Sequence, residues 1–150
     1  MFRAVRFRRM LLGHQKGQAL LEFALVMIFF LLVLMAVLDL GRAYFVMVAV
    51  ENAAAEGALY GMSNPNCINQ GDCGAVERSV QYRILNESNS AMIDPSRLNF
   101  LVEFDPVDPK APGTMIKVTV WYDFQPILPL LSAFGAGTIT IRHVAIQLIP

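Results

Sequence analysis

The sequence predicts an α+β protein that one long N-terminal helix anchors in a membrane. Three observations support this prediction. Residues 19–38 are apolar at every position except Glu22, no proline interrupts the chain before residue 60, and the last third contains three runs of strand-like alternation. We expect the outer half of the long helix to pack on a small domain with a second helix and a three-stranded antiparallel sheet.

The composition agrees with a membrane span followed by a small domain. The chain has 150 residues, of which 55% are hydrophobic and only 16% are charged, so it is more apolar than an ordinary soluble domain. Twenty helical residues extend over about 30 Å, which is the thickness of the hydrocarbon core of a bilayer. We therefore expect the membrane span at about residues 19–38.

The charges predict the orientation of this span. Five of the twelve basic residues and none of the twelve acidic residues lie in the first 17 positions. By the positive-inside rule, residues 1–17 are a basic cytoplasmic leader and residues 61–150 are an extracytoplasmic α+β domain. The expected location is the cytoplasmic membrane, which the chain crosses once. Nucleic acid is not an expected partner, because the basic arm adjoins a membrane span and has few aromatic residues.

The long helix is expected over residues 18–60. Its length is about 60 Å, twice the thickness of a bilayer, so its second half must project outward. Beyond Asp39 an amphipathic pattern predicts that this half lies on the core of the outer domain. The apolar positions of that pattern are Leu40, Tyr44, Met47, Val50, Ala54 and Ala58.

A polar loop and a second helix are expected next. Cys67 and Cys73 lie six residues apart in the loop, and an extracytoplasmic location favours their oxidation to a disulfide. Two free thiols are the alternative, while a metal site is unfavourable because two cysteines supply too few ligands. The helix is expected over residues 74–87, with Asp72 as its N-cap.

Three strands are expected at residues 99–104, 114–124 and 138–149. The second run is the clearest, because apolar and polar residues alternate over eleven positions. In the third run the apolar phase changes near Arg142 and His143, which suggests a bulge or a twist.

Two groups of residues are candidate interfaces. Asp39 and Arg42 lie three apart on the long helix, so they share a face and can pair. They either contact partner proteins or form a solvated pair outside the bilayer. The segment 126–134 is unusually apolar for a loop, so it contacts a partner subunit or the membrane surface, or else covers the sheet edge or the core. Its apolar side chains are Ile127, Leu128, Leu130, Leu131 and Phe134.

A short motif spans the junction between the leader and the membrane span. Glu22 is a carboxylate inside an apolar run, where a charge costs about 3 kcal/mol on insertion scales, unless it reaches water at the interface. Gly17, Gln18 and Glu22 have the spacing of type IV pilin-like proteins, which carry a basic leader, a glycine before the cut and a glutamate at the fifth mature position. More closely, three segments resemble the TadE-like family of tight-adherence pilus systems: Gly17-Gln-Ala-Leu-Leu-Glu-Phe-Ala-Leu25, Leu38-Asp-Leu-Gly-Arg42 and Ala53-Ala-Ala-Glu-Gly-Ala58.

The resemblance implies a pilin-like fold and a structural role, as a minor pilin or pseudopilin of a tight-adherence, type IV-like pilus. It implies that a prepilin peptidase cuts between Gly17 and Gln18. It also implies that Glu22 pairs with the N-terminus of an adjacent subunit, which sets the axial register. The implied partners are the peptidase, other pilins, pilus assembly platform proteins and membrane lipid, and the chain could end in an extracellular pilus. Many pilins have Phe where this chain has Gln18, so methylation of the new N-terminus stays open.

The sequence favours assembly over catalysis. The two histidines are His14 in the leader and His143 in the third expected strand, and no glycine-rich phosphate loop follows a strand. Asp105, Asp108 and Asp123 lack the spacing of a calcium loop, so neither a cofactor nor a metal is expected. The alternative function is an uncut, membrane-anchored extracytoplasmic binding module.

Overall fold

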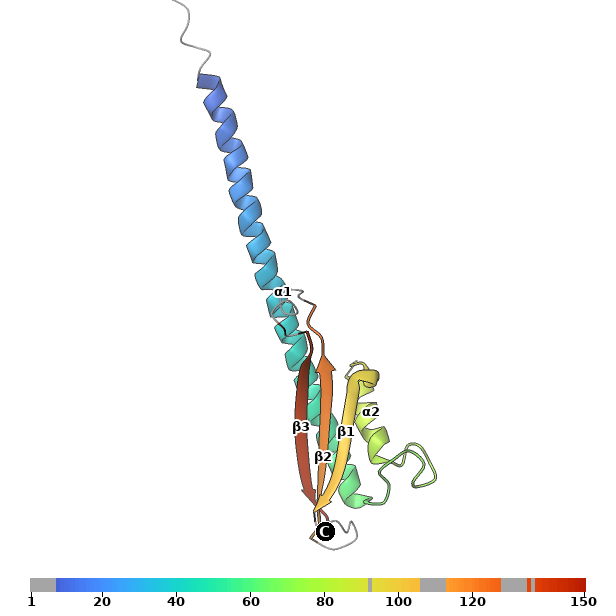
Figure 1. Ribbon diagram of the computed structural model, residues 1–150. Coiled ribbons are helices and arrows are strands. Elements are labelled where there is room, and N and C mark those ends of the chain that lie inside the picture. The colour runs from blue at the N-terminus through green and yellow to red at the C-terminus, as the bar shows by residue number, and fades with distance from the viewer. Residues whose placement is uncertain (1–7, 92, 106–112, 128–134, 136) are drawn as a thin grey trace, which may run out of the picture. The chain divides into compact units, whose positions relative to one another are not determined.

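A computed structural model describes residues 8–91, 93–105, 113–127, 135 and 137–150 (Figure 1). In chain order the elements are α1 (Arg8–Ser63), α2 (Val80–Ser90), the 3-10 helix η1 (Pro95–Arg97), β1 (Leu98–Asp105), β2 (Met115–Phe124) and β3 (Ile139–Leu148). The expected α+β class, with one long helix, a second helix and a three-stranded sheet, is confirmed. The chain divides into two compact units at Asp39, and each is described by itself.

The first unit is the N-terminal part of α1. The helix begins at Arg8, ten residues before the expected start at Gln18, so the second half of the basic leader is helical. Between Leu20 and Leu38 the large apolar side chains are exposed by 39–69%. By length and composition this helix can cross a membrane, and its exposed apolar surface is what contact with lipid or other helices requires.

The second unit, residues 40–150, is called the outer unit below, and its core lies between the C-terminal half of α1 and one face of the sheet. The strands run alongside this half of the helix (Figure 1). Small residues cover the face of α1 that meets the sheet, and they recur at helical spacing. The buried positions are Val46, Ala49, Val50, Ala53, Ala54, Gly57, Ala58 and Gly61 from α1, against Ile116, Val118, Val120, Tyr122 and Phe124 from β2.

The amphipathic pattern expected along this part of α1 is only half right. Val50, Ala54 and Ala58 are buried as expected. Leu40, Tyr44 and Met47 are instead exposed, by 71%, 68% and 54%. The face toward the sheet is lined by alanine and glycine, because only small side chains let the helix backbone approach the strands closely.

The sheet has the order β1-β2-β3, and both pairs are antiparallel. The register of β2 with β3 is continuous from Met115 opposite Leu148 to Phe124 opposite Ile139, so these two strands contain no bulge, and that part of the expectation was wrong. The phase change in the sequence has another cause. Regular alternation turns Val144, Ile146 and Leu148 to the outer face, where they are exposed by 38–58%.

The second helix begins at Val80, six residues later than expected. Ser79 is its N-cap, and the Ser79 hydroxyl oxygen accepts a hydrogen bond of 3.1 Å from the N–H of Tyr82. The expected cap, Asp72, instead accepts a hydrogen bond of 2.7 Å from the N–H of Asn69 inside the loop. Gly74 has φ of 78°, a left-handed conformation that interrupts a right-handed helix at this position.

Candidate functional site

The residues of the expected processing motif lie on one continuous helix. Gly17, Gln18 and Glu22 all belong to α1. The side-chain Nε2 of Gln18 donates a hydrogen bond of 3.3 Å to Oε1 of Glu22, one helical turn further on. Gly17 has no atom within 4 Å of the position that a Cβ would occupy. Packing among the described residues therefore gives no reason for a glycine at position 17.

Glu22 is an acidic group on an apolar helix surface. The side chains of Leu21, Phe23 and Leu25 around it are exposed by 62–67%, and Glu22 is exposed as well. Among the residues that the structure describes, its polar partner is the neutral amide of Gln18. An amide donates a hydrogen bond but does not compensate the charge of the carboxylate. In an apolar environment an uncompensated charge of this kind is costly.

Asp39 and Arg42 differ in their surroundings. Asp39 is only 5% exposed, although Leu38 and Leu40 beside it are exposed by 57% and 71%. The guanidinium of Arg42 lies over the ring of Phe124, with its Cζ 5.3 Å from the ring centroid. This cation–π contact joins α1 to the end of β2. Pairing between Asp39 and Arg42 stays a prediction.

Ile127 is the one residue of the expected apolar interface that the structure describes. It is 62% exposed and follows Phe124, the last residue of β2, by three positions. The remaining residues of that expected interface, Leu128, Leu130, Leu131 and Phe134, lie outside the described residues. Because Phe124 contacts Arg42, Ile127 lies at the end of the outer unit where that unit begins along α1.

The expected disulfide between Cys67 and Cys73 is confirmed, with their Cα atoms 5.4 Å apart. The loop that it closes is tied to α2. The carbonyl of Cys67 accepts a hydrogen bond of 2.8 Å from the N–H of Val80, and that of Ile68 accepts one of 3.0 Å from Gln81. Together with the Ser79 cap, these bonds satisfy the first three N–H groups of the helix. The disulfide loop therefore has a structural role.

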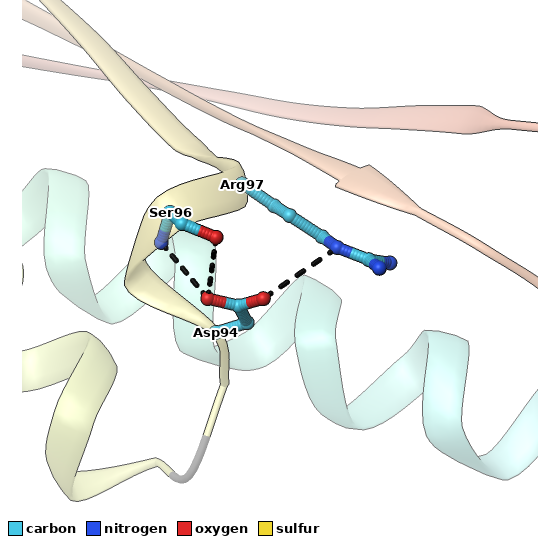
Figure 2. A network of polar contacts seen from close by, with 3 residues as sticks. All are labelled: Asp94, Ser96 and Arg97. Atoms are coloured by element: carbon cyan, nitrogen blue, oxygen red, sulfur yellow. Dashed lines mark hydrogen bonds and ion pairs between the residues drawn. The ribbon is translucent and has the colours of Figure 1, made fainter.

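A surface cap precedes β1. Figure 2 shows the carboxylate of Asp94, whose Oδ1 accepts hydrogen bonds of 3.0 Å from the N–H and 2.7 Å from the hydroxyl of Ser96. The Nε of Arg97 lies 3.6 Å from the Oδ2 of Asp94. The hydrogen bonds from Ser96, and then the charge of Arg97, lower the pKa of Asp94. The cap holds the turn that leads from α2 into β1.

Within the segment 53–58, Ala54 and Ala58 were expected on the core, whereas the packing of Ala53 and Gly57 was missed by the sequence reasoning. Ala53, Ala54 and Ala58 are fully buried. A Cβ on Gly57 would lie 2.7 Å from Cγ1 of Ile84 in α2 and 3.4 Å from Cγ1 of Val118 in β2. The signal was present in the sequence, as small residues at positions 53, 54, 57, 58 and 61.

The described residues show no constellation that points to catalysis. No group of three or more His, Cys, Asp or Glu side chains among them is placed to hold a metal ion. His143, a described histidine, lies in β3 opposite Val120. The features that stand out are instead an apolar helix surface with one carboxylate and a well-packed outer unit.

Comparison with known proteins supports the interpretation of the N-terminal part. The model of the TadE-like protein family matches residues 17–59. This range begins at the glycine of the expected processing motif and includes all three segments that resemble the family, so the resemblance is confirmed over that range. It indicates a pilin-like protein associated with tight-adherence pili. No curated protein and no solved structure matches the chain.

Proposed function

We propose that this chain is a minor pilin or pseudopilin, a structural component of a tight-adherence, type IV-like pilus assembly, and that a prepilin peptidase processes it. The observation that supports this most strongly is the family match over residues 17–59. These residues form a helix whose first part exposes apolar side chains to its surroundings. A protein of this design works by packing against other subunits and not by catalysis.

The proposed cut lies between Gly17 and Gln18. A glycine inside a helix costs about 0.5–1 kcal/mol relative to alanine, and among the described residues no atom lies within 4 Å of the position that a Cβ on Gly17 would occupy. A glycine at position 17 is explained if the peptidase requires a small residue immediately before the cut. The basic leader holds this site on the cytoplasmic side of the membrane, with the outer unit on the opposite side.

The proposed role of Glu22 is to set the register between subunits. The cut frees the α-amine of Gln18, one helical turn from a carboxylate whose partner in the same chain is a neutral amide. When the helices leave lipid and pack together, the Glu22 carboxylate of one subunit pairs with the α-amine of an adjacent subunit. Each buried charge then has a partner, whereas any other axial alignment leaves both charges uncompensated.

In this proposal the apolar surface between Leu20 and Leu38 contacts two different environments, one after the other. In the cytoplasmic membrane it contacts lipid. In the pilus it contacts the equivalent helices of other pilins, and the assembly platform proteins mediate the transfer. The same exposed side chains suit both environments, because neither offers hydrogen bonds to the helix surface.

The test is a set of variants in a host that carries the tight-adherence machinery. Glu22→Ala should still be processed but should fail to assemble, because the α-amine loses its partner. Glu22→Asp, which keeps the charge, should retain partial assembly. Glu51→Ala, an exposed glutamate on the same helix outside the apolar run, is the matched control and should assemble normally. If Glu22→Ala is processed and assembles as well as the control, Glu22 has no register role.

A further inference from the structure

The apolar surface of α1 continues into the outer unit. Leu40, Tyr44, Phe45 and Met47 are exposed by 53–71%. Val48 follows at 37%, and the exposed positions after it, Glu51 and Asn52, are polar. Residues 40–48, about two and a half turns of helix beyond the expected span, therefore carry large apolar side chains that stay exposed.

Two other segments bring apolar side chains to the same end of this unit. Phe124 lies under the guanidinium of Arg42, so the end of β2 lies beside the start of the outer unit along α1. Ile127 follows this strand end and is 62% exposed. Ile139, the first residue of β3, lies opposite Phe124 in the sheet and is 42% exposed. We call the six exposed residues the basal surface: Leu40, Tyr44, Phe45, Met47, Ile127 and Ile139.

The basal surface has the chemistry of a membrane interface. Tyr44 and Phe45 are adjacent aromatic residues, and a tyrosine ring has an apolar body and a polar tip, as side chains at headgroup level typically do. Arg42, whose guanidinium lies over the ring of Phe124, places a cation at this end of the unit. The acidic residue next to Phe124 on β2 is Asp123, and it has a partner within the sheet: its carboxylate accepts a hydrogen bond of 2.9 Å from the hydroxyl of Thr140.

The position of the basal surface along the chain indicates that lipid is what covers it. Leu40 follows the apolar run 19–38 directly, and the headgroup layer on each side of the hydrocarbon core is roughly 5–8 Å thick. At about 1.5 Å per residue, positions 39–44 cross that layer. Their place in the chain therefore puts residues 40–44 at the headgroup layer, where a protein partner would have to displace lipid to reach them.

We propose that the basal surface docks the outer unit on the lipid headgroup layer of the membrane that its own helix spans. Three segments of the unit then contact the bilayer, so the unit does not stand off on a bare helical stalk. This proposal rests on the membrane span alone and is independent of pilus assembly. The proposal places Ile127 and Ile139 in the headgroup layer together with Tyr44, although they lie on a different part of the chain.

The test uses single-tryptophan variants of the full chain in phosphatidylcholine and phosphatidylglycerol vesicles with brominated acyl chains. The chain has one tryptophan, so Trp121→Phe provides the background. Tyr44→Trp and Ile127→Trp report on the basal surface, and Leu34→Trp in the span is the positive control. Leu59→Trp is the matched negative control, because Leu59 is 47% exposed on the same helix but lies about 22 Å beyond Tyr44.

Brominated lipid should quench tryptophan at positions 44 and 127 at least half as strongly as at position 34, and should leave position 59 unquenched. The two reporters lie on different segments, so local misfolding at one position does not remove the test. Quenching at 44 and 127 no greater than at 59 overturns the proposal. A blue-shifted emission at these positions without quenching also overturns it, because protein and not lipid then covers the surface.

Discussion

Replacing Gly57 by alanine should destabilise the outer unit, although alanine is the better helix former. Gly57 lies where α1 contacts both α2 and β2. The new Cβ would lie 2.7 Å from Cγ1 and 3.0 Å from Cδ1 of Ile84, and 3.4 Å from Cγ1 of Val118. Both neighbours are fully buried, and both are β-branched with stiff χ1 angles. The methyl group can be accommodated only if α1 moves or these side chains leave their preferred rotamers.

Two opposing effects set the magnitude. Forcing an extra methyl group into a packed core costs about 1–3 kcal/mol, while alanine stabilises a helix by about 1 kcal/mol relative to glycine. Gly41 lies on the same helix and has nothing within 4 Å of its Cβ position. Gly41→Ala therefore changes the helix propensity alone. The difference in unfolding free energy between the two variants isolates the packing cost, which we expect to be about 1–3 kcal/mol.

The assay is thermal unfolding of the full chain in detergent micelles, followed by near-ultraviolet circular dichroism. For a domain of about 100 residues, 1 kcal/mol shifts Tm by roughly 4 °C or more. Gly57→Ala should therefore unfold at least about 4 °C below Gly41→Ala. Equal Tm values for the two variants would refute the close approach of α1 to α2 and β2.

Three smaller effects follow from the same structure. The disulfide closes a short loop, with Cys67 and Cys73 six positions apart. Changing both to alanine should lower the unfolding free energy by about 2 kcal/mol, and an unchanged denaturation midpoint would contradict its structural role. The lowered pKa of Asp94 means that its carboxylate stabilises the folded state above the ordinary pKa of 3.8, and that this contribution is lost as the pH falls below that value. Asp94→Ala should therefore be less stable than the parent at pH 7, and this difference in stability should become smaller below about pH 4. If thermal melts show the same difference in stability at every pH, the contacts of Asp94 with Ser96 and Arg97 do not stabilise the fold. The ion pair between Glu103 and Lys117 is 2.7 Å long but 41–48% exposed, so Lys117→Gln should cost less than about 1 kcal/mol in chemical denaturation, and a larger loss would show that the pair is more than a surface contact.

The long helix and the central strand could be predicted from the sequence because each has a strong apolar pattern of its own. Residues 19–38 are apolar almost throughout, and β2 alternates over its whole length. The face of α1 that meets the sheet was harder to predict. Hydrophobicity singles out Tyr44 and Met47, but close packing selects alanine and glycine, which are weakly hydrophobic.

The start of α2 and the register of β3 depend on contacts between distant parts of the chain. Asp72 and Ser79 are both good N-cap residues, and the choice of Ser79 is made by the carbonyls of the disulfide loop, which bind the first N–H groups of the helix. In β3 the phase change suggested a bulge because an outer face is expected to be polar. Ile146 and Leu148 lie on that face nevertheless, and no local signal distinguishes the two cases.

The N-terminus of the chain in the membrane tests the central claim most directly. The chain should be isolated from membranes of a cell that carries a prepilin peptidase, and its intact mass and N-terminal sequence measured. Processing between Gly17 and Gln18 predicts that Gln18 is the first residue, with or without a methyl group on its amine. Retention of Met1 and the whole basic leader would contradict the proposed processing and would favour an uncut, membrane-anchored binding module.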